Sequence, residues 1–88
     1  MFDDETQVAW QAMPNRAPVV AADGSEIGTA ESTLGDQSED IFHGIVVKQR
    51  GSGRHLEIPA ARIKKITEKH VVTDLTEDDL AALQPKPG

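Results

Sequence analysis

The chain has 88 residues, with 15 acidic and nine basic side chains and a net charge of −6. It has no cysteine and no apolar run long enough to cross a bilayer, which excludes disulfides and thiolate sites and predicts a soluble, cytoplasmic protein without membrane contact. The acidic balance disfavours nucleic acid as a partner, because a phosphate backbone attracts basic surfaces.

The length predicts one domain close to the lower limit for independent folding. Its three aromatic residues are Phe2, Trp10 and Phe42, so the core must consist mainly of Val, Ile and Leu. A core of this size supplies about 3–5 kcal/mol, so a sheet that closes on itself or self-association would matter for stability. We expect an N-terminal extension over residues 1–16, a β-domain over 17–75, and a capping helix with a tail over 76–88.

The N-terminal extension allows two interpretations. Asp3, Asp4 and Glu5 suit the start of a short helix, which Pro14 would end. Trp10 is then either a lid packed over the open end of the core, which we favour, or an exposed anchor for a partner.

Residues 18–33 predict a β-hairpin. Asp23-Gly24 lies between two strand-like segments and is typical of a two-residue type I′ turn. The returning strand extends to Thr33, and Gly28 within it indicates a bend or a close backbone approach. A polar loop over residues 34–40 follows.

The most apolar segment runs from Ile41 to Val47 and predicts a strand covered on both faces, with a bend at Gly44. Two further strands are expected over residues 54–58 and 69–74, separated by a helical turn at 59–62. Thr76 and Asp79 occupy capping-box positions and predict a helix to about Leu83, with Leu80 and Leu83 on one face.

Charge is divided along the chain. Residues 17–48 carry six acidic residues against one lysine, and residues 49–71 carry six basic residues against two acidic ones. Two solvated faces are the favoured interpretation, although the halves could also pair within one domain or between two copies.

No catalytic, cofactor or metal site is predicted. The three histidines, His43, His55 and His70, match no ligand spacing, and the acids of the loop over residues 34–40 lack the order of a calcium loop. The glycines around Arg54 do not form a phosphate loop, and no supported Ser-His-Asp arrangement is present.

A set of turn and core positions over residues 17–74 consists of Val20, Asp23-Gly24, Ile27-Gly28, Asp40-Ile41-Phe42, Gly44-Ile45-Val46-Val47, Ile58-Pro59-Ala60, Ile63, Ile66 and Val71-Val72. This set resembles the PRC-barrel domain, the small β-module of the photosynthetic reaction centre H subunit and of a ribosome-maturation factor. The resemblance implies an all-β fold, a small antiparallel β-barrel of about six strands with a short C-terminal helix. It also implies docking or assembly without shared catalytic residues. Neither the membrane helix of the H subunit nor the RNA-associated domain of the maturation factor is recognisable here, so those roles do not transfer.

We therefore expect a non-enzymatic interaction module that binds another protein or a second copy of itself as a homodimer, with no cofactor. The candidate interaction surface consists of Trp10, Arg50, Arg54, Arg62, Lys64, Lys65 and Lys69. The alternatives are a small-ligand or stress-associated binding domain and, third, an accessory protein associated with RNA or the ribosome. The third ranks lowest because the basic segment lacks interleaved aromatic residues for base stacking.

Overall fold

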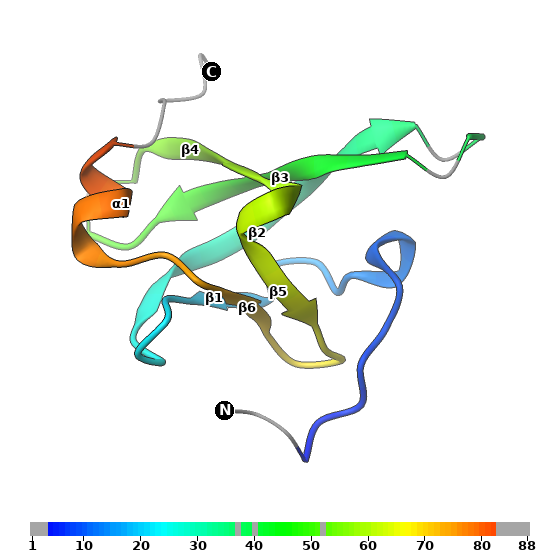
Figure 1. Cartoon of the computed structure of the whole chain (residues 1–88), viewed down its shortest axis with the longest axis horizontal. Helices are drawn as coiled ribbons and strands as arrows, with labels where there is room; N and C mark the ends of the chain where they lie inside the picture. The colour runs from blue at the N-terminus through cyan, green and yellow to red at the C-terminus, as the bar shows by residue number, and fades with distance from the viewer. Residues whose placement is uncertain (1–3, 37, 40, 52, 83–88) are drawn as a thin grey trace.

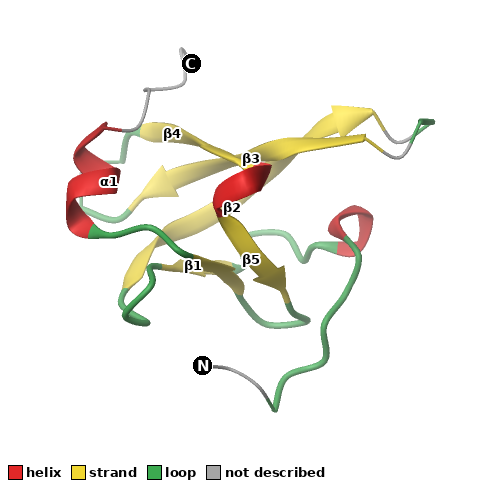
Figure 2. Ribbon diagram, in the orientation of Figure 1, coloured by secondary structure: helices red, strands yellow, loops and turns green. Residues whose placement is uncertain are grey.

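Six β-strands form one sheet, accompanied by two 3-10 turns and one short helix (Figures 1 and 2). The computed structural model describes residues 4–36, 38–39, 41–51 and 53–82. No helix within these ranges is long and apolar enough to cross a bilayer. The elements are η1 (Trp10–Ala12), β1 (Pro18–Val20), β2 (Glu26–Asp36), β3 (Ile41–Gln49), β4 (His55–Pro59), η2 (Ala60–Arg62), β5 (Ile63–Ile66), β6 (Val71–Thr73) and α1 (Glu77–Ala82). The expected β-rich fold with a C-terminal helix is confirmed.

The strand order is β4-β3-β2-β1-β6-β5, and the sheet is mixed. β1 and β6 run parallel, with Val19 opposite Val71 and Val20 opposite Val72, whereas the other neighbouring pairs are antiparallel. The sequence predicted a wholly antiparallel sheet, and this prediction is wrong for the β1–β6 pair. Parallel neighbours need a long crossover connection, which β2 to β5 supply here.

The two ends of the sheet are β4 and β5. η2 joins them along the chain, but no pairing between β4 and β5 occurs among the described residues. The strands curl in the manner of a small barrel, and β5 runs from η2 toward the lower part of the view, below β4 (Figure 1). The hydrogen-bonded sheet therefore ends in two margins instead of closing fully.

The β1–β2 connection is a hairpin, but its turn differs from the expected one. Its loop spans residues 21–25, where the Ala21 N–H donates to the Ser25 carbonyl (2.8 Å) and the Gly24 N–H to the Ala21 carbonyl (2.9 Å). Gly24 has a φ of 89°, but Asp23 does not have the positive φ that a type I′ turn requires. The Asp23 carboxylate instead accepts hydrogen bonds from the N–H (2.9 Å) and hydroxyl (2.7 Å) of Ser25, which favours the longer loop.

β2 and β3 form a long hairpin that projects from the body of the molecule (Figure 1). β2 continues beyond its expected end at Thr33 to Asp36. A Cβ added at Gly28 would overlap the backbone carbonyl of Lys48 in β3, and one added at Gly44 would overlap that of Ile58 in β4. Both glycines therefore permit close contact between neighbouring strands, as the sequence indicated for Gly28.

The core is aliphatic and closely filled. Its fully buried members include Val19, Val47, Val71, Ile45 and Ile58. The strand β3 is buried on both faces from residue 44 to residue 47, as predicted. No buried side-chain polar atom lacks a hydrogen-bond partner among the described residues. The interior of the sheet is therefore occupied by aliphatic side chains in contact with one another.

Residues 4–13, which we call the N-terminal strap, are not helical apart from η1. The prediction of a short helix starting at Asp3, Asp4 and Glu5 is wrong for the described residues. A segment this short gains more stability from pairing with the sheet than from an isolated helical turn. α1 begins after Thr76, as predicted, and Leu80 packs against the core. Phe2, Asp3, Leu83 and the tail after Leu83 lie outside the described residues.

Candidate protein-interaction site

The N-terminal strap binds the turn between β5 and β6 through a carboxylate. Glu5 accepts a hydrogen bond from the Thr67 hydroxyl (2.6 Å) and lies 2.8 and 2.9 Å from Nδ1 of His70. The Thr67 hydroxyl and, to a lesser degree, His70 hold the pKa of Glu5 below its usual range. Glu5 lies more than 60 residues before Thr67 and His70 in the chain, so these contacts fasten the strap to the turn.

This cluster is built for attachment rather than for catalysis. Thr67 is fully buried, and its oxygen also accepts the backbone N–H of His70 (2.8 Å). The hydroxyl donates to Glu5, whereas nucleophilic catalysis needs the hydroxyl beside a base in a position open to substrate. Among the described residues, no group of three His, Cys, Asp or Glu side chains could hold a metal ion.

The strap also extends the sheet through its backbone. Gln7 and Thr67 form an antiparallel bridge. The Val8 N–H donates to the Ile66 carbonyl (2.8 Å), and the Glu68 N–H donates to the Thr6 carbonyl (2.9 Å). Residues 6–8 therefore act as a short additional strand along the margin of β5, which would otherwise be an open sheet edge.

Trp10 anchors the other end of the strap. Its ring stacks on Phe42 of β3, with centroids 5.2 Å apart and planes 14° apart. A Cβ at Gly35 would come within 3.2 Å of Cη2 of Trp10, so the glycine leaves room for the indole. Trp10 is half-buried and packs against the core with Val8 and Met13. This geometry supports the interpretation of Trp10 as a lid over the core.

The six basic residues of the predicted interaction surface fall into different surroundings. Arg50 and Arg54 flank the β3–β4 turn, Lys64 and Lys65 lie on β5, Lys69 lies in the β5–β6 turn, and Arg62 ends η2. Arg50 lies 3.6 Å from Glu26, in a solvent-exposed pair that contributes little to stability. Arg54 and Lys65 also make polar contacts within the chain. Lys64 and Lys69 are exposed, on the same margin of the sheet as the strap.

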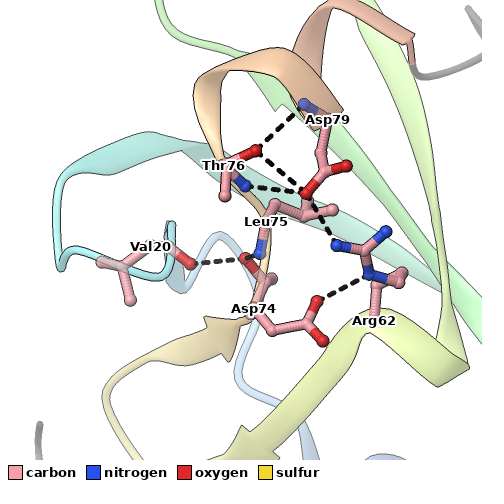
Figure 3. Close-up of polar contacts among 7 residues, drawn as sticks. Val20, Arg62, Asp74, Leu75, Thr76 and Asp79 are labelled. Atoms are coloured by element: carbon pink, nitrogen blue, oxygen red, sulfur yellow. Dashed lines mark hydrogen bonds and ion pairs between the residues drawn. The ribbon is translucent and has the colours of Figure 1, made fainter.

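Arg62 is held in an intramolecular network that fastens α1 to the sheet (Figure 3). Its Nε lies 2.7 Å from Asp74 and its Nη2 lies 2.7 Å from Asp79. The same oxygen of Asp79 accepts the N–H and the hydroxyl of Thr76 (both 3.1 Å), which completes the predicted capping box. The Thr76 N–H and Arg62 hold the pKa of Asp79 below its usual range. Arg62 therefore has a structural role.

A shallow groove lies outside the sheet, between the β1–β2 loop and α1. Its volume is about 380 Å³. Apolar side chains of Ala21, Leu75 and Leu80 line it together with the acids Asp23, Glu77 and Asp78 and their neighbours Ala22, Ser25 and Thr76. The Asp23 carboxylate is already bound to Ser25, which keeps its pKa below the usual range. The groove is the clearest place on the described surface for a small ligand.

Comparison with known protein families assigns most of the chain to one domain. The family model of the PRC-barrel domain matches residues 14–80. The chain belongs to the PRC-barrel domain family. PRC-barrel domains are generally non-catalytic modules, in keeping with the site just described.

The N-terminal strap lies before the part of the chain that matches the PRC-barrel domain. It contributes contacts that sequence reasoning missed, namely those of Glu5 with Thr67 and His70. No local pattern could have revealed them, because the partners are far apart along the chain. The strap therefore adds contacts to the sheet from outside the matched residues.

Proposed function

We propose that this PRC-barrel protein is a non-catalytic assembly module that associates with a second copy of itself. The observation that carries the proposal is the open sheet, which ends in β4 on one side and in β5 on the other. β5 is extended by the short strap, whereas no further strand pairs with β4 among the described residues. Sheet margins are surfaces on which a second chain can add a strand.

Two further features support self-association over a partner of unrelated sequence. The described acids Glu31, Asp36 and Glu39 lie on the projecting β2–β3 hairpin, whereas Lys64 and Lys69 lie on the β5 margin. Two copies therefore offer each other charges of opposite sign. The aliphatic core is also small, so a dimer interface would add apolar burial that one chain lacks.

The melting temperature as a function of protein concentration tests the proposal. Because a dimer is stabilised by mass action, the melting temperature should rise steadily from low to high micromolar protein. A melting temperature independent of concentration over that range would contradict self-association.

The groove beside α1 supports a second candidate function, the binding of a small ligand. A groove lined by both apolar and acidic residues fits a small organic cation. In the same assay, a panel of cationic metabolites should raise the melting temperature at fixed protein concentration, and the variant Asp78→Asn should reduce that shift. A panel without effect would leave assembly as the remaining candidate.

A further inference from the structure

We propose that the docking site under the N-terminal strap accepts the strap of a second copy, so that two chains associate by exchanging residues 4–13. This inference rests on the proposed function and names its interface. The occupant of the site is already known in one chain, because the strap itself fills it through Glu5, the backbone of residues 6–8, and Trp10. A second copy carries the same strap and can make the same contacts.

The docking site is complementary to the strap in charge and in shape. The strap carries the acids Asp4 and Glu5 and no basic residue. The turn against which it lies contains Lys69 and His70 together with one acid, Glu68, whose side chain is exposed. Gly35 leaves space for the indole of Trp10, and Phe42 offers it an aromatic face. Without the strap, the Thr67 hydroxyl would lose Glu5, and the Ile66 carbonyl and the Glu68 N–H would lose their backbone partners.

The segment that connects the strap to the sheet favours exchange. Residues 14–17 form a tight turn, in which the Ala17 N–H donates to the Pro14 carbonyl at 3.4 Å. Among the described residues, Arg16 is the only residue other than glycine with a positive φ, which is 58°. A side chain with a Cβ is strained in this conformation. An exchanged strap extends the turn and releases that strain, and short strained hinges are known to promote exchange.

The strap makes the same contacts before and after the exchange. Each strap leaves one chain and enters the other, so the hydrogen bonds to Thr67, Ile66 and Glu68 and the stack on Phe42 are made again. Extending the turn relieves the strain at Arg16 but opens the hydrogen bond from the Arg16 N–H to the Ala30 carbonyl (2.9 Å). Association also costs the independent motion of two chains, so protein concentration decides the equilibrium. Exchange should therefore increase with protein concentration.

Disulfide trapping tests the proposal in the full chain, which has no cysteine of its own. Thr6 and Glu68 are exposed and face each other across the bridge, with their backbones joined by a hydrogen bond of 2.9 Å. Chains carrying Thr6→Cys and chains carrying Glu68→Cys are mixed at high micromolar concentration and oxidised. Thr6→Cys mixed with Glu77→Cys is the matched control, because Glu77 is exposed on α1.

Exchange predicts that the disulfide between positions 6 and 68 exceeds the control disulfide by at least about tenfold, because the strap holds the two thiols at high effective concentration. Arg16→Gly should reduce this yield, since glycine removes the strain from the closed turn. Equal yields in the two mixtures would overturn the proposal.

The margin of β4 is the competing interface, and a separate pair of variants addresses it. Gln49 and Arg54 close the β3–β4 hairpin, so the alternating pattern points the His55 N–H away from β3. His55→Pro removes this donor, whereas His55→Ala keeps it. If exchange is correct, light scattering gives dimers for both variants.

The outcomes separate the inference from the proposed function. A dimer that is lost in His55→Pro, kept in His55→Ala and not trapped between positions 6 and 68 would overturn strap exchange and leave self-association intact. An unmodified chain that is monomeric at every concentration would overturn both.

Discussion

Replacing Trp10 by alanine is the most informative perturbation of the strap. The indole is half-buried, packs against the core and stacks on Phe42 at 5.2 Å. A tryptophan buries about 150–250 Å², which at about 25 cal/mol per Å² corresponds to about 4–6 kcal/mol as an upper bound. Because the ring is partly exposed and the strap can settle into the gap, we expect a loss of about 2–4 kcal/mol, including the stacking contribution.

This loss is large for a domain of this size. Each kcal/mol shifts the melting temperature of a 60–100-residue domain by about 4–8 °C, so Trp10→Ala should lower it by at least about 8 °C. Far-UV circular dichroism in urea and on heating measures the change, because the variant lacks the tryptophan fluorescence signal. The control is Trp10→Phe, which keeps a ring over Phe42 and should lose less than about half as much.

A loss below about 0.5 kcal/mol for Trp10→Ala would refute the reasoning, since that is the range of surface substitutions. The indole would then not cover the core, and its alternative role as an exposed anchor for a partner would be favoured.

Three further predictions concern the core, the hairpin loop and acid stability. Ile45→Ala should destabilise the fold by about 2–5 kcal/mol in urea unfolding, because Ile45 is fully buried; a loss below about 0.5 kcal/mol would place it outside the core. Gly24→Val should lose about 1–2 kcal/mol because φ is 89° there, whereas Gly24→Asn should lose less; equal losses would show that φ is not the cause. The folded-state pKa values of Glu5 and Asp79 are lowered, so the stability that these carboxylates contribute is complete above their ordinary values of 4.5 and 3.8 and is lost as pH falls through the folded values. The urea concentration at the unfolding midpoint should therefore decrease once the pH falls below about 4.5, and it should decrease less steeply for Glu5→Gln than for the unmodified chain. Identical pH profiles for the two proteins would exclude a contribution from Glu5.

Much of the sheet could be predicted from the sequence, because local patterns determine where strands begin and which residues are buried. The apolar segment containing Ile45 predicted a strand covered on both faces, and residues 54–58 were expected to form the strand that the structure has as β4. Thr76 and Asp79 predicted the start of α1 because a capping box is a contact between residues three apart.

The sequence was less informative about pairing direction and turn geometry. The short segments of β1 and β6 contain only valines, proline and threonine, and such composition carries no signal for a parallel pair. Asp23-Gly24 indicated the hairpin correctly, but the bonds from Ser25 to Asp23 favour a longer loop than the dipeptide alone suggests.

The interaction site was the hardest part to predict. Trp10 was recognised as a candidate, and its preferred interpretation as a lid agrees with the stack on Phe42. The acid at Glu5 was assigned to a helix start, because nothing near it in sequence reveals Thr67 or His70 as partners. Contacts between distant segments depend on the whole fold, and local periodicity does not encode them.

The molar mass of the unmodified chain in solution tests the central claim most directly. The chain has a mass of 9.5 kDa. Static light scattering on a series from low to high micromolar protein should give a mass that rises from that value toward twice that value. A mass that stays at 9.5 kDa across the series would contradict assembly by this PRC-barrel protein.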